Sequence, residues 1–348
     1  MKWQKMIGKE YRVREMVKSG LKVVVVIPCY KVEAHISEVV ESLPDFVSKA
    51  ILVNDASPDA TCNVIDDLAK NHDFVEPIHV KENLGVGGAT LIGFQRAIQL
   101  GAHIIVKMDG DNQMEPRYLI PMIDPLIRGE ADFAKGNRLT SVGHLQQMPW
   151  IRLVGNALLS LLARAATGYW NVLDPTNGYV AIRSDVFELL PEKYIDNRYF
   201  FEMSMLLALG IAGAVVRDVP MPSKYAGEAS SLSVRVALME FPLKILKGFL
   251  RRFWYRKILY SLTIEALLFI LGLILFAAGS AFGLYNFLYF GFVARAYASP
   301  GTVMFAALPM LAGIQLLLNG LMLDIQSVPT RPLSQRITSV FLKKERKE

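Results

Sequence analysis

Two carboxylates stand one residue apart in the stretch KMDGDNQMEP (residues 107–116), and Gln113 follows them with an amide oxygen. Mg²⁺ and Mn²⁺ prefer carboxylate, carbonyl and water oxygens, and substrate phosphates often complete their coordination shell. Asp109 and Asp111 with Gln113 therefore predict a site at which Mg²⁺ or Mn²⁺ holds a diphosphate. The alternative is a plain surface turn, because Asp, Gly and Asn are common turn residues.

A glycine-rich stretch, NLGVGGAT (residues 83–90), follows an expected strand and opens an expected helix. It does not fit the dinucleotide-binding pattern G-x-G-x-x-G, because Thr90 stands where the third glycine is required. Helix capping and a tight turn are the alternative to a binding role. The P-loop pattern G-x-x-x-x-G-K-[ST] is absent, which excludes a P-loop nucleotide hydrolase, and neither G-x-S-x-G nor H-E-x-x-H occurs.

The elements that must position the two acids alternate along the first part of the chain. Short β-branched runs predict strands, and the segments between and after them have helical patterns. The expected strands are 21–28, 50–55, 74–80, 102–109 and 131–138, and the expected helices are 34–44, 59–72, 87–101 and 116–129. This alternation predicts an α/β domain with a mostly parallel, Rossmann-like sheet covered on both faces.

Polar residues stand where the expected strands end. In a parallel α/β sheet, ligands bind beyond the carboxyl ends of the strands. The polar residues at those ends are Tyr30, Asp55, Asp109, Asp111 and Arg138. We therefore expect them to converge on one rim of the sheet.

The pattern continues to about residue 233. We expect a long amphipathic helix at 150–168, a strand at 178–184, a helix at 199–210 and a strand at 212–221. Residues 223–233 are small and polar, which predicts a mobile loop over the site.

Two apolar windows follow. From Ile258 to Val293 the only charged residue is Glu265, and from Ala296 to Leu323 there is none. Each window exceeds the ~20 apolar residues that a helix needs to cross a bilayer. We place the spans at about 263–285 and 302–323. The pattern GSAFG (residues 279–283) is a possible helix-packing face, which permits a homo-oligomer.

Basic residues flank these windows, and the connecting loop carries only Arg295. The positive-inside rule therefore puts both ends of the hairpin in the cytoplasm. Residues 243–257 form an expected basic amphipathic helix with Leu246, Leu250 and Trp254 on its apolar side, which suits a lipid surface. An ordinary surface helix of the globular domain is the alternative.

Composition agrees with a membrane protein. Apolar residues make up 52% of the 348 residues, and the formal net charge is +6. The position of the basic residues suits anionic lipid rather than nucleic acid. Residues 1–20 lack an apolar core of signal-peptide length, so we expect no cleaved secretory signal.

The expected parts are a basic N-terminal segment (1–20), a catalytic-size domain (21–233), a juxtamembrane amphipathic helix (234–257), the membrane hairpin (258–325) and a basic cytoplasmic tail (326–348).

Six ordered stretches resemble a known family. They are VVIPCY (25–30), VNDASPDAT (53–61), NLGVGGA (83–89), MDGDNQMEP (108–116), KGNR (135–138) and DPTNGYVAIR (174–183). The chain resembles family 2 glycosyltransferases of the GT-A fold over roughly residues 20–330. The D-x-D-x-Q form, the later arginine pair and the hairpin are most similar to the polyprenyl-phosphate branch, which includes dolichyl-phosphate mannose synthases and bacterial undecaprenyl-phosphate sugar transferases.

The resemblance implies roles for individual residues. Residues on the nucleotide-sugar side would be Pro28, Tyr30, Glu33, Asp55, Asp109, Gly110 and Asp111. Asp109, Asp111 and Gln113 would hold the metal and the diphosphate. Arg138 and Arg152 would meet the acceptor phosphate, and Asp174 would lie near the sugar or acceptor, as an orienting group or a base.

The alternatives for these last three residues stay open. Arg138 could pair with a surface acid, Arg152 could be a solvated helix position, and Asp174 could be a turn residue in DPTNG. The chain also departs from the family, with Lys31 and Val32 where Asn-Glu is frequent and Asn54 where the second motif commonly has Asp. These departures leave the base and the sugar open.

The leading hypothesis is a metal-dependent inverting transferase of the plasma (inner) membrane. It would move a sugar from a nucleotide diphosphate, with UDP as our choice, to polyprenyl phosphate at the cytoplasmic face. A lipid monophosphate is already an anionic nucleophile, so this chemistry needs positioning and charge relief rather than a strong base. The alternatives are a family 2 enzyme with a polysaccharide or glycolipid acceptor and a non-catalytic nucleotide-binding membrane scaffold.

Overall fold

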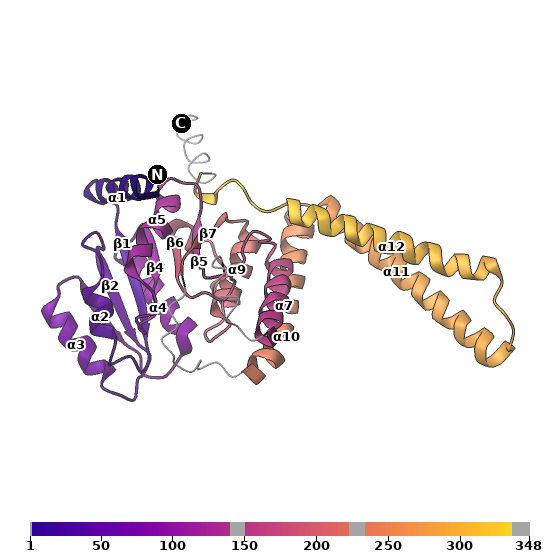
Figure 1. Ribbon diagram of the computed structural model, residues 1–348, viewed down its shortest axis with the longest axis horizontal. Helices are drawn as coiled ribbons and strands as arrows, with labels where there is room; N and C mark the ends of the chain where they lie inside the picture. Colours follow the sequence, from indigo (N-terminus) through magenta and orange to yellow (C-terminus); the bar gives the residue numbers. More distant parts are fainter. Residues whose placement is uncertain (1, 140–149, 223–233, 336–348) are drawn as a thin grey trace. The chain divides into compact units, whose positions relative to one another are not determined.

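The computed structural model describes residues 2–139, 150–222 and 234–335 (Figure 1). The chain divides into two compact units, Met1–Phe249 together with Pro329–Glu348, and Leu250–Val328. The predicted loop 223–233 and most of the predicted basic tail (336–348) lie outside the described residues.

The first unit is built on a sheet whose described strands run in the order β3-β2-β1-β4-β6-β5-β7. They are β1 (Val23–Cys29), β2 (Lys49–Asn54), β3 (Val75–His79), β4 (Ile104–Lys107), β5 (Phe133–Asn137), β6 (Val180–Arg183) and β7 (Val216–Pro220). The prediction of a mostly parallel sheet is confirmed, with one strand reversed. β6 runs antiparallel to both of its neighbours, β4 and β5.

The reversal of β6 matters for the site. Because β6 is antiparallel, it begins at the edge of the sheet where β4 and β5 end. Val180, its first residue, pairs with both Lys107 of β4 and Lys135 of β5. The segment that leads into β6 is thereby placed between the ends of those two strands.

Helices flank this sheet (Figure 1). They are α1 (Lys2–Lys18), α2 (Ile36–Glu41), α3 (Thr61–Asn71), α4 (Gly85–Gln99), α5 (Leu119–Ile127), α7 (Trp150–Thr167), α8 (Ser184–Phe187), α9 (Phe201–Ala212) and α10 (Val234–Arg252), with short 3₁₀ turns η1 (Pro116–Tyr118) and η2 (Glu192–Tyr194).

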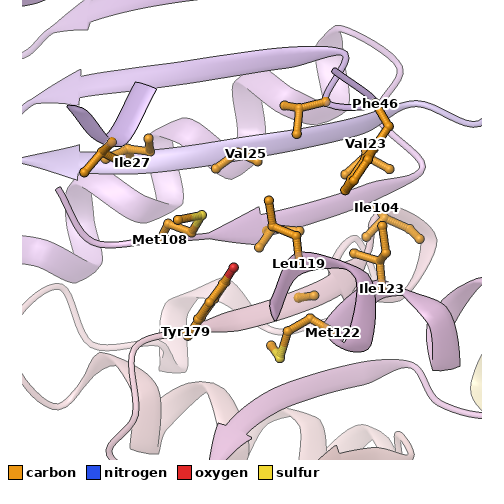
Figure 2. Packing of buried hydrophobic residues seen from close by; sticks show 14 of the residues in the cluster. Val23, Val25, Ile27, Phe46, Ile104, Met108, Leu119, Met122, Ile123 and Tyr179 are labelled. Atoms are coloured by element: carbon orange, nitrogen blue, oxygen red, sulfur yellow. The ribbon is translucent and has the colours of Figure 1, made fainter. Parts of the chain in front are cut away.

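The main core packs α2, α3 and α5 against the sheet. Figure 2 shows Val25 and Ile27 of β1 with Leu119 and Met122 of α5 in this cluster. Ile104, Val106 and Met108 along and just after β4 belong to the same core. Since successive strand side chains point to opposite faces, Lys107 and Asp109 point to the other face.

Helix α10 shares its apolar residues between two surroundings. Phe241 and Ile245 are buried in a cluster with Phe200 and Leu207. Leu246 stays exposed. The predicted amphipathic helix is therefore a packing element of the globular unit, and its contact with a lipid surface stays a prediction.

The second unit contains two long helices, α11 (Ile264–Leu288) and α12 (Pro300–Gln326), with π-helical turns η3 (Phe253–Leu259) and η4 (Tyr289–Ala294). Both long helices are apolar and long enough to cross a membrane. Gly279 lies so close to α12 that a Cβ there would sit 2.8 Å from the Ala306 carbonyl oxygen. The predicted packing face at 279–283 is thus used inside the hairpin, and it gives no separate support to a homo-oligomer.

A buried charge cluster lies within the second unit. Arg252 Nη1 is 3.0 Å from Asp324 Oδ1, and Lys257 Nζ is 3.1 Å from the same oxygen. Lys257 also pairs with Glu265 at 3.2 Å. Two of the basic residues that flank the apolar windows, Arg252 and Lys257, therefore pair with acids of the hairpin, of which Asp324 is buried and Glu265 is partly exposed.

Candidate active site

The D-x-D stretch forms a tight loop directly after β4. Asn112 takes a left-handed backbone conformation with φ of 58°, and the Gln113 amide donates to Asp111 Oδ1 at 3.1 Å. The turn predicted as the alternative is therefore present, and it places the carboxylates of Asp109 and Asp111 in one loop at the end of the sheet. Gly110 approaches the loop after β1, since a Cβ on it would lie 3.3 Å from Val32 Cγ2.

A buried lysine holds the first of these acids. Lys107 Nζ lies 2.7 Å from Asp109 Oδ1 and 3.1 Å from Glu202 Oε1. Burial alone would lower the pKa of Lys107, but the two carboxylates outweigh it and raise the pKa above its ordinary value. Sequence reasoning missed Lys107 and Glu202. The available signal was a lysine inside the apolar run HIIVKM, two residues before Asp109.

Arg138 and Asp174 form a two-point ion pair. Arg138 Nε lies 2.8 Å and Nη2 3.2 Å from the two oxygens of Asp174, and the Arg138 amide also donates to Oδ2. Asp174 is buried, whereas the Arg138 side chain is 41% exposed. Burial alone would raise the pKa of Asp174, but hydrogen bonds and charge from Arg138, with charge from Lys135, lower it. Asp174 is therefore a weak base that holds a half-exposed guanidinium.

A second buried lysine lies beneath this pair. Lys135 Nζ donates to the Asn177 carbonyl oxygen. Burial lowers the pKa of Lys135 to about 8, against the opposing charges of Glu202 and Asp174. Sequence reasoning missed this residue too, although it stands in the KGNR stretch.

The segment 174–178 connects the two halves of the rim. Asp174 pairs with Arg138, and Asn177 accepts from Lys135. A Cβ on Gly178 would lie 2.7 Å from both Asp109 Oδ2 and Lys107 Nζ. The structure thus brings Asp109, Arg138 and Asp174 together around one turn before β6.

Hydrogen bonds to Asp218 of β7 also hold the end of β5 in place. Asp218 Oδ2 accepts from Asn137 Nδ2 at 2.7 Å and from the Leu173 amide at 3.0 Å. Burial raises the pKa of Asp218 despite these hydrogen bonds. Asn137 precedes Arg138, so these hydrogen bonds fix the backbone that carries the guanidinium.

The residues predicted for the nucleotide lie at and beyond β1 and β2. Pro28 is buried within β1, and Tyr30 just after it is 45% exposed. Glu33 accepts a hydrogen bond from the Ala60 amide at 2.7 Å, which ties the loop after β1 to the loop after β2. These residues share a rim with the D-x-D loop through the contact of Gly110 with Val32.

Asp55 has a structural task. Its two carboxylate oxygens accept from the Leu84 amide at 2.7 Å and the Gly85 amide at 2.9 Å. These amides open α4 and have no partner within the helix, so Asp55 satisfies them. Asp55 is 2% exposed, so its carboxylate is not open to direct contact with a ligand. It would affect a ligand indirectly, by fixing the backbone at the start of α4.

The glycines of NLGVGGAT let another segment approach closely. Gly85 has φ of +84°, and a Cβ on Gly87 would lie 2.3 Å from the Asp196 carbonyl oxygen. The Gly88 amide donates to the Asn197 carbonyl oxygen at 2.9 Å. The stretch begins α4, whose first amides donate to Asp55, and it allows a close backbone approach that the sequence did not predict.

Arg152 lies in the first turn of α7, but its side chain is outside the described part of the structure. Its predicted role stays a prediction.

Comparison with known proteins decides the family. The model described as Glycosyl transferase family 2 matches residues 24–190. A UDP-N-acetylglucosamine–dolichyl-phosphate N-acetylglucosaminyltransferase of Methanococcus voltae is 30% identical over 187 residues, which cover 50% of this chain and 74% of the relative. The chain belongs to glycosyltransferase family 2.

Other relatives of this family 2 chain agree. A polyprenol monophosphomannose synthase of Mycolicibacterium smegmatis is 29% identical, covering 59% of this chain and 78% of the relative. An undecaprenyl-phosphate mannosyltransferase of Micrococcus luteus is 29% identical, covering 58% and 83% respectively. Among solved structures, Mycobacterium tuberculosis glucosyl-3-phosphoglycerate synthase with Mg²⁺ and UDP has a TM-score of 0.50 at 19% identity, covering 69% of this chain and 83% of that chain. That likeness shows the GT-A fold.

Proposed function

We propose that this family 2 glycosyltransferase moves a sugar from a nucleotide diphosphate, UDP in the first instance, to a polyprenyl phosphate at a membrane surface. The observation that carries the proposal is the rim itself. It holds two acids in one loop beside a half-exposed arginine that a buried aspartate orients, in a chain with two membrane-length helices. The names of its relatives, which act on dolichyl, polyprenol and undecaprenyl phosphates, support the same acceptor class.

The D-x-D loop suits a divalent cation. Asp109 and Asp111 supply carboxylate oxygens from one loop, and Gln113 can add an amide oxygen, which is the donor set of Mg²⁺ or Mn²⁺. We assign these three residues to the cation. When bound, the cation would neutralise charge on the departing diphosphate. Pro28, Tyr30, Glu33 and Asp55 are proposed for the nucleotide side, with Asp55 acting through the α4 loop that it fixes.

The arginine side suits a phosphate acceptor. Arg138 presents a planar guanidinium that can grip a phosphate with two donors, and we propose the same for Arg152. An acceptor phosphate oxygen would form a bond to the anomeric carbon as the bond from that carbon to the nucleotide diphosphate breaks, which inverts the configuration. Since the pKa of Asp174 is lowered, we assign it to orienting Arg138 rather than to proton abstraction.

The two membrane-length helices support a lipid as the acceptor. We propose that the hairpin at about 258–325 spans the plasma membrane and that the catalytic domain (about 21–233) lies in the cytoplasm, as the distribution of basic residues predicts. The helix at 234–257 and the tail at 326–348 would then lie at the same membrane surface, which is the level of a lipid phosphate.

A substrate screen tests this proposal. The full-length chain in detergent or liposomes would be supplied with radiolabelled UDP- and GDP-sugars and undecaprenyl phosphate, and the organic phase would be counted. We expect labelled lipid from one donor class only when a divalent cation is present. Label in a polymer or another glycolipid would favour a different acceptor, and metal-dependent nucleotide binding without turnover would favour the scaffold.

A further inference from the structure

Lys107 is an unusual residue for its place in the sheet. It stands at the end of β4, where it pairs with Val26 of β1 and Val180 of β6, and it is 1% exposed. A buried ammonium is costly unless carboxylates pair with it and bind its protons. Packing alone therefore does not explain why a lysine stands at this position.

Two elements meet around this ammonium, the end of β4 and the start of α9. Lys107 and Asp109 leave the end of β4 on the same face, and their side chains meet at 2.7 Å. Glu202, in the first turn of α9, reaches Lys107 Nζ at 3.1 Å. The Glu202 side chain is itself 12% exposed, so the lysine and the glutamate depend on each other.

The turn before β6, which contains Gly178, is the third element next to this ammonium. A side chain there would overlap the space that Asp109 Oδ2 and Lys107 Nζ occupy, because a Cβ would be 2.7 Å from each atom. Asp109 is therefore confined by Lys107 on one oxygen and by the backbone of the turn before β6 on the other side. An isolated exposed carboxylate after a strand would have far more freedom.

We propose that Lys107 and Glu202 are positioning residues for Asp109. Glu202 fixes the ammonium, and the ammonium fixes one carboxylate oxygen of Asp109, so that a single oxygen remains for the divalent cation. This inference rests on the proposed function, because it concerns the cation assigned to the D-x-D loop. Partners of this kind, one step behind a metal ligand, typically change metal affinity by roughly 10–100-fold when they are removed.

The test replaces the pair without changing the net charge. In the full-length chain, Lys107→Met with Glu202→Gln removes one positive and one negative group. The readout is the dissociation constant of Mn²⁺, measured by electron paramagnetic resonance of free Mn²⁺ with UDP present, so no turnover is needed. We expect Mn²⁺ binding to weaken roughly 10–100-fold.

The matched control is the exposed pair Lys70 and Asp67, whose atoms lie 2.9 Å apart. Lys70→Met with Asp67→Asn removes the same charges far from the D-x-D loop and should leave the Mn²⁺ constant unchanged. A folded double variant at Lys107 and Glu202 with Mn²⁺ affinity within twofold of the intact chain would overturn the proposal, even if its melting temperature fell, because that pattern belongs to a purely structural pair.

A single variant covers the case in which the double variant does not fold. Glu202→Gln keeps the shape of the side chain and leaves Lys107 paired with Asp109 alone. Without the carboxylate of Glu202, the ammonium is held less firmly and fixes Asp109 less well, so Mn²⁺ binding should weaken, by less than in the double variant. An unchanged constant contradicts the positioning role. If the intact chain itself binds no Mn²⁺ with UDP present, the proposed metal function fails first, and the positioning role fails with it.

Discussion

Arg138 is the residue at which the proposed acceptor chemistry can be separated from the donor chemistry. Its guanidinium is held by Asp174 through two contacts, yet its side chain is 41% exposed and so accessible to a phosphate. A hydrogen bond to a charged group contributes about 1.5–3 kcal/mol. Arg138→Ala should therefore raise the KM for the lipid phosphate about 10–100-fold and leave the KM for the nucleotide sugar nearly unchanged.

The control for that variant is Arg14→Ala. Arg14 is similarly exposed and pairs with Asp45 and Glu10 on the surface. It should leave both constants unchanged in steady-state transfer kinetics. Equal increases in the two constants for Arg138→Ala would remove the acceptor role.

Lys135 predicts a pH dependence of stability. Burial lowers its pKa to about 8 in the folded chain, whereas a lysine in the unfolded chain has its ordinary pKa of about 10.5. Between these two values the unfolded state binds more protons, so this residue's contribution to the free energy of unfolding rises with pH. Below pH 8 the lysine is charged in both states and its full burial cost remains.

The comparison that isolates this effect is the intact chain against Lys135→Met, unfolded in detergent from pH 7 to pH 10.5. The stability of the intact chain relative to the variant should rise across that range by up to about 3 kcal/mol. A difference that is flat or falls with pH would contradict a lowered pKa.

Site residues that stand in sequence motifs were easier to predict than charged residues that reach the site only because the fold buries them there. Asp109, Arg138 and Asp174 stand in recognisable patterns, and the structure places them around one turn. Lys107 and Lys135 belong to apolar strand runs, and only the antiparallel β6 brings Asn177 and Gly178 against them. A long-range strand order of this kind cannot be derived from local spacing.

At the scale of elements, the start of α4 is held by close contacts on two sides. Its glycines allow the segment around Asp196 to pass within backbone contact, and Asp55 binds its first amides. A Cβ on Gly87 would lie 2.3 Å from the Asp196 carbonyl oxygen, so one of the two segments must move. Gly87→Ala should destabilise the catalytic unit by about 1–3 kcal/mol and weaken nucleotide binding.

Gly155→Ala in α7 is the matched substitution, because a Cβ there meets nothing within 4 Å. It should be neutral or stabilise the helix by up to about 1 kcal/mol. Thermal unfolding of both variants checks the pair. Equal melting temperatures would show that the glycine loop tolerates a side chain and that the close approach is not required.

Most of the described strands and helices could be predicted because their periodicity is local. β1 to β5 and the two long helices of the hairpin lie within a few residues of the predicted ranges. The surroundings of α10 could not be predicted, since its apolar residues serve both α9 packing and an exposed surface. The sequence also did not say which helix packs against Gly279, because a small residue on a membrane helix can contact a helix of the same chain or of another copy. In the structure this helix is α12 of the same chain.

At the scale of the whole molecule, the chain combines a family 2 unit with a second unit in which charged side chains form ion pairs with one another. Arg252 and Lys257 are buried within the second unit, where they pair with the buried Asp324 and the partly exposed Glu265. The orientation that we propose follows from the distribution of basic residues along the sequence. A catalytic unit joined to such a hairpin is suited to an acceptor whose phosphate lies at the membrane surface.

We propose that the D-x-D loop binds a divalent cation on which sugar transfer to a lipid phosphate depends. The most direct measurement compares the intact chain with Asp111→Asn, prepared identically in liposomes that contain undecaprenyl phosphate. The transfer of radiolabelled sugar to the lipid is followed with Mn²⁺ and with EDTA. We predict transfer by the intact chain that EDTA abolishes, and none by Asp111→Asn at an unchanged melting temperature. Transfer by Asp111→Asn within a few-fold of the intact chain, or transfer that persists in EDTA, would contradict the account.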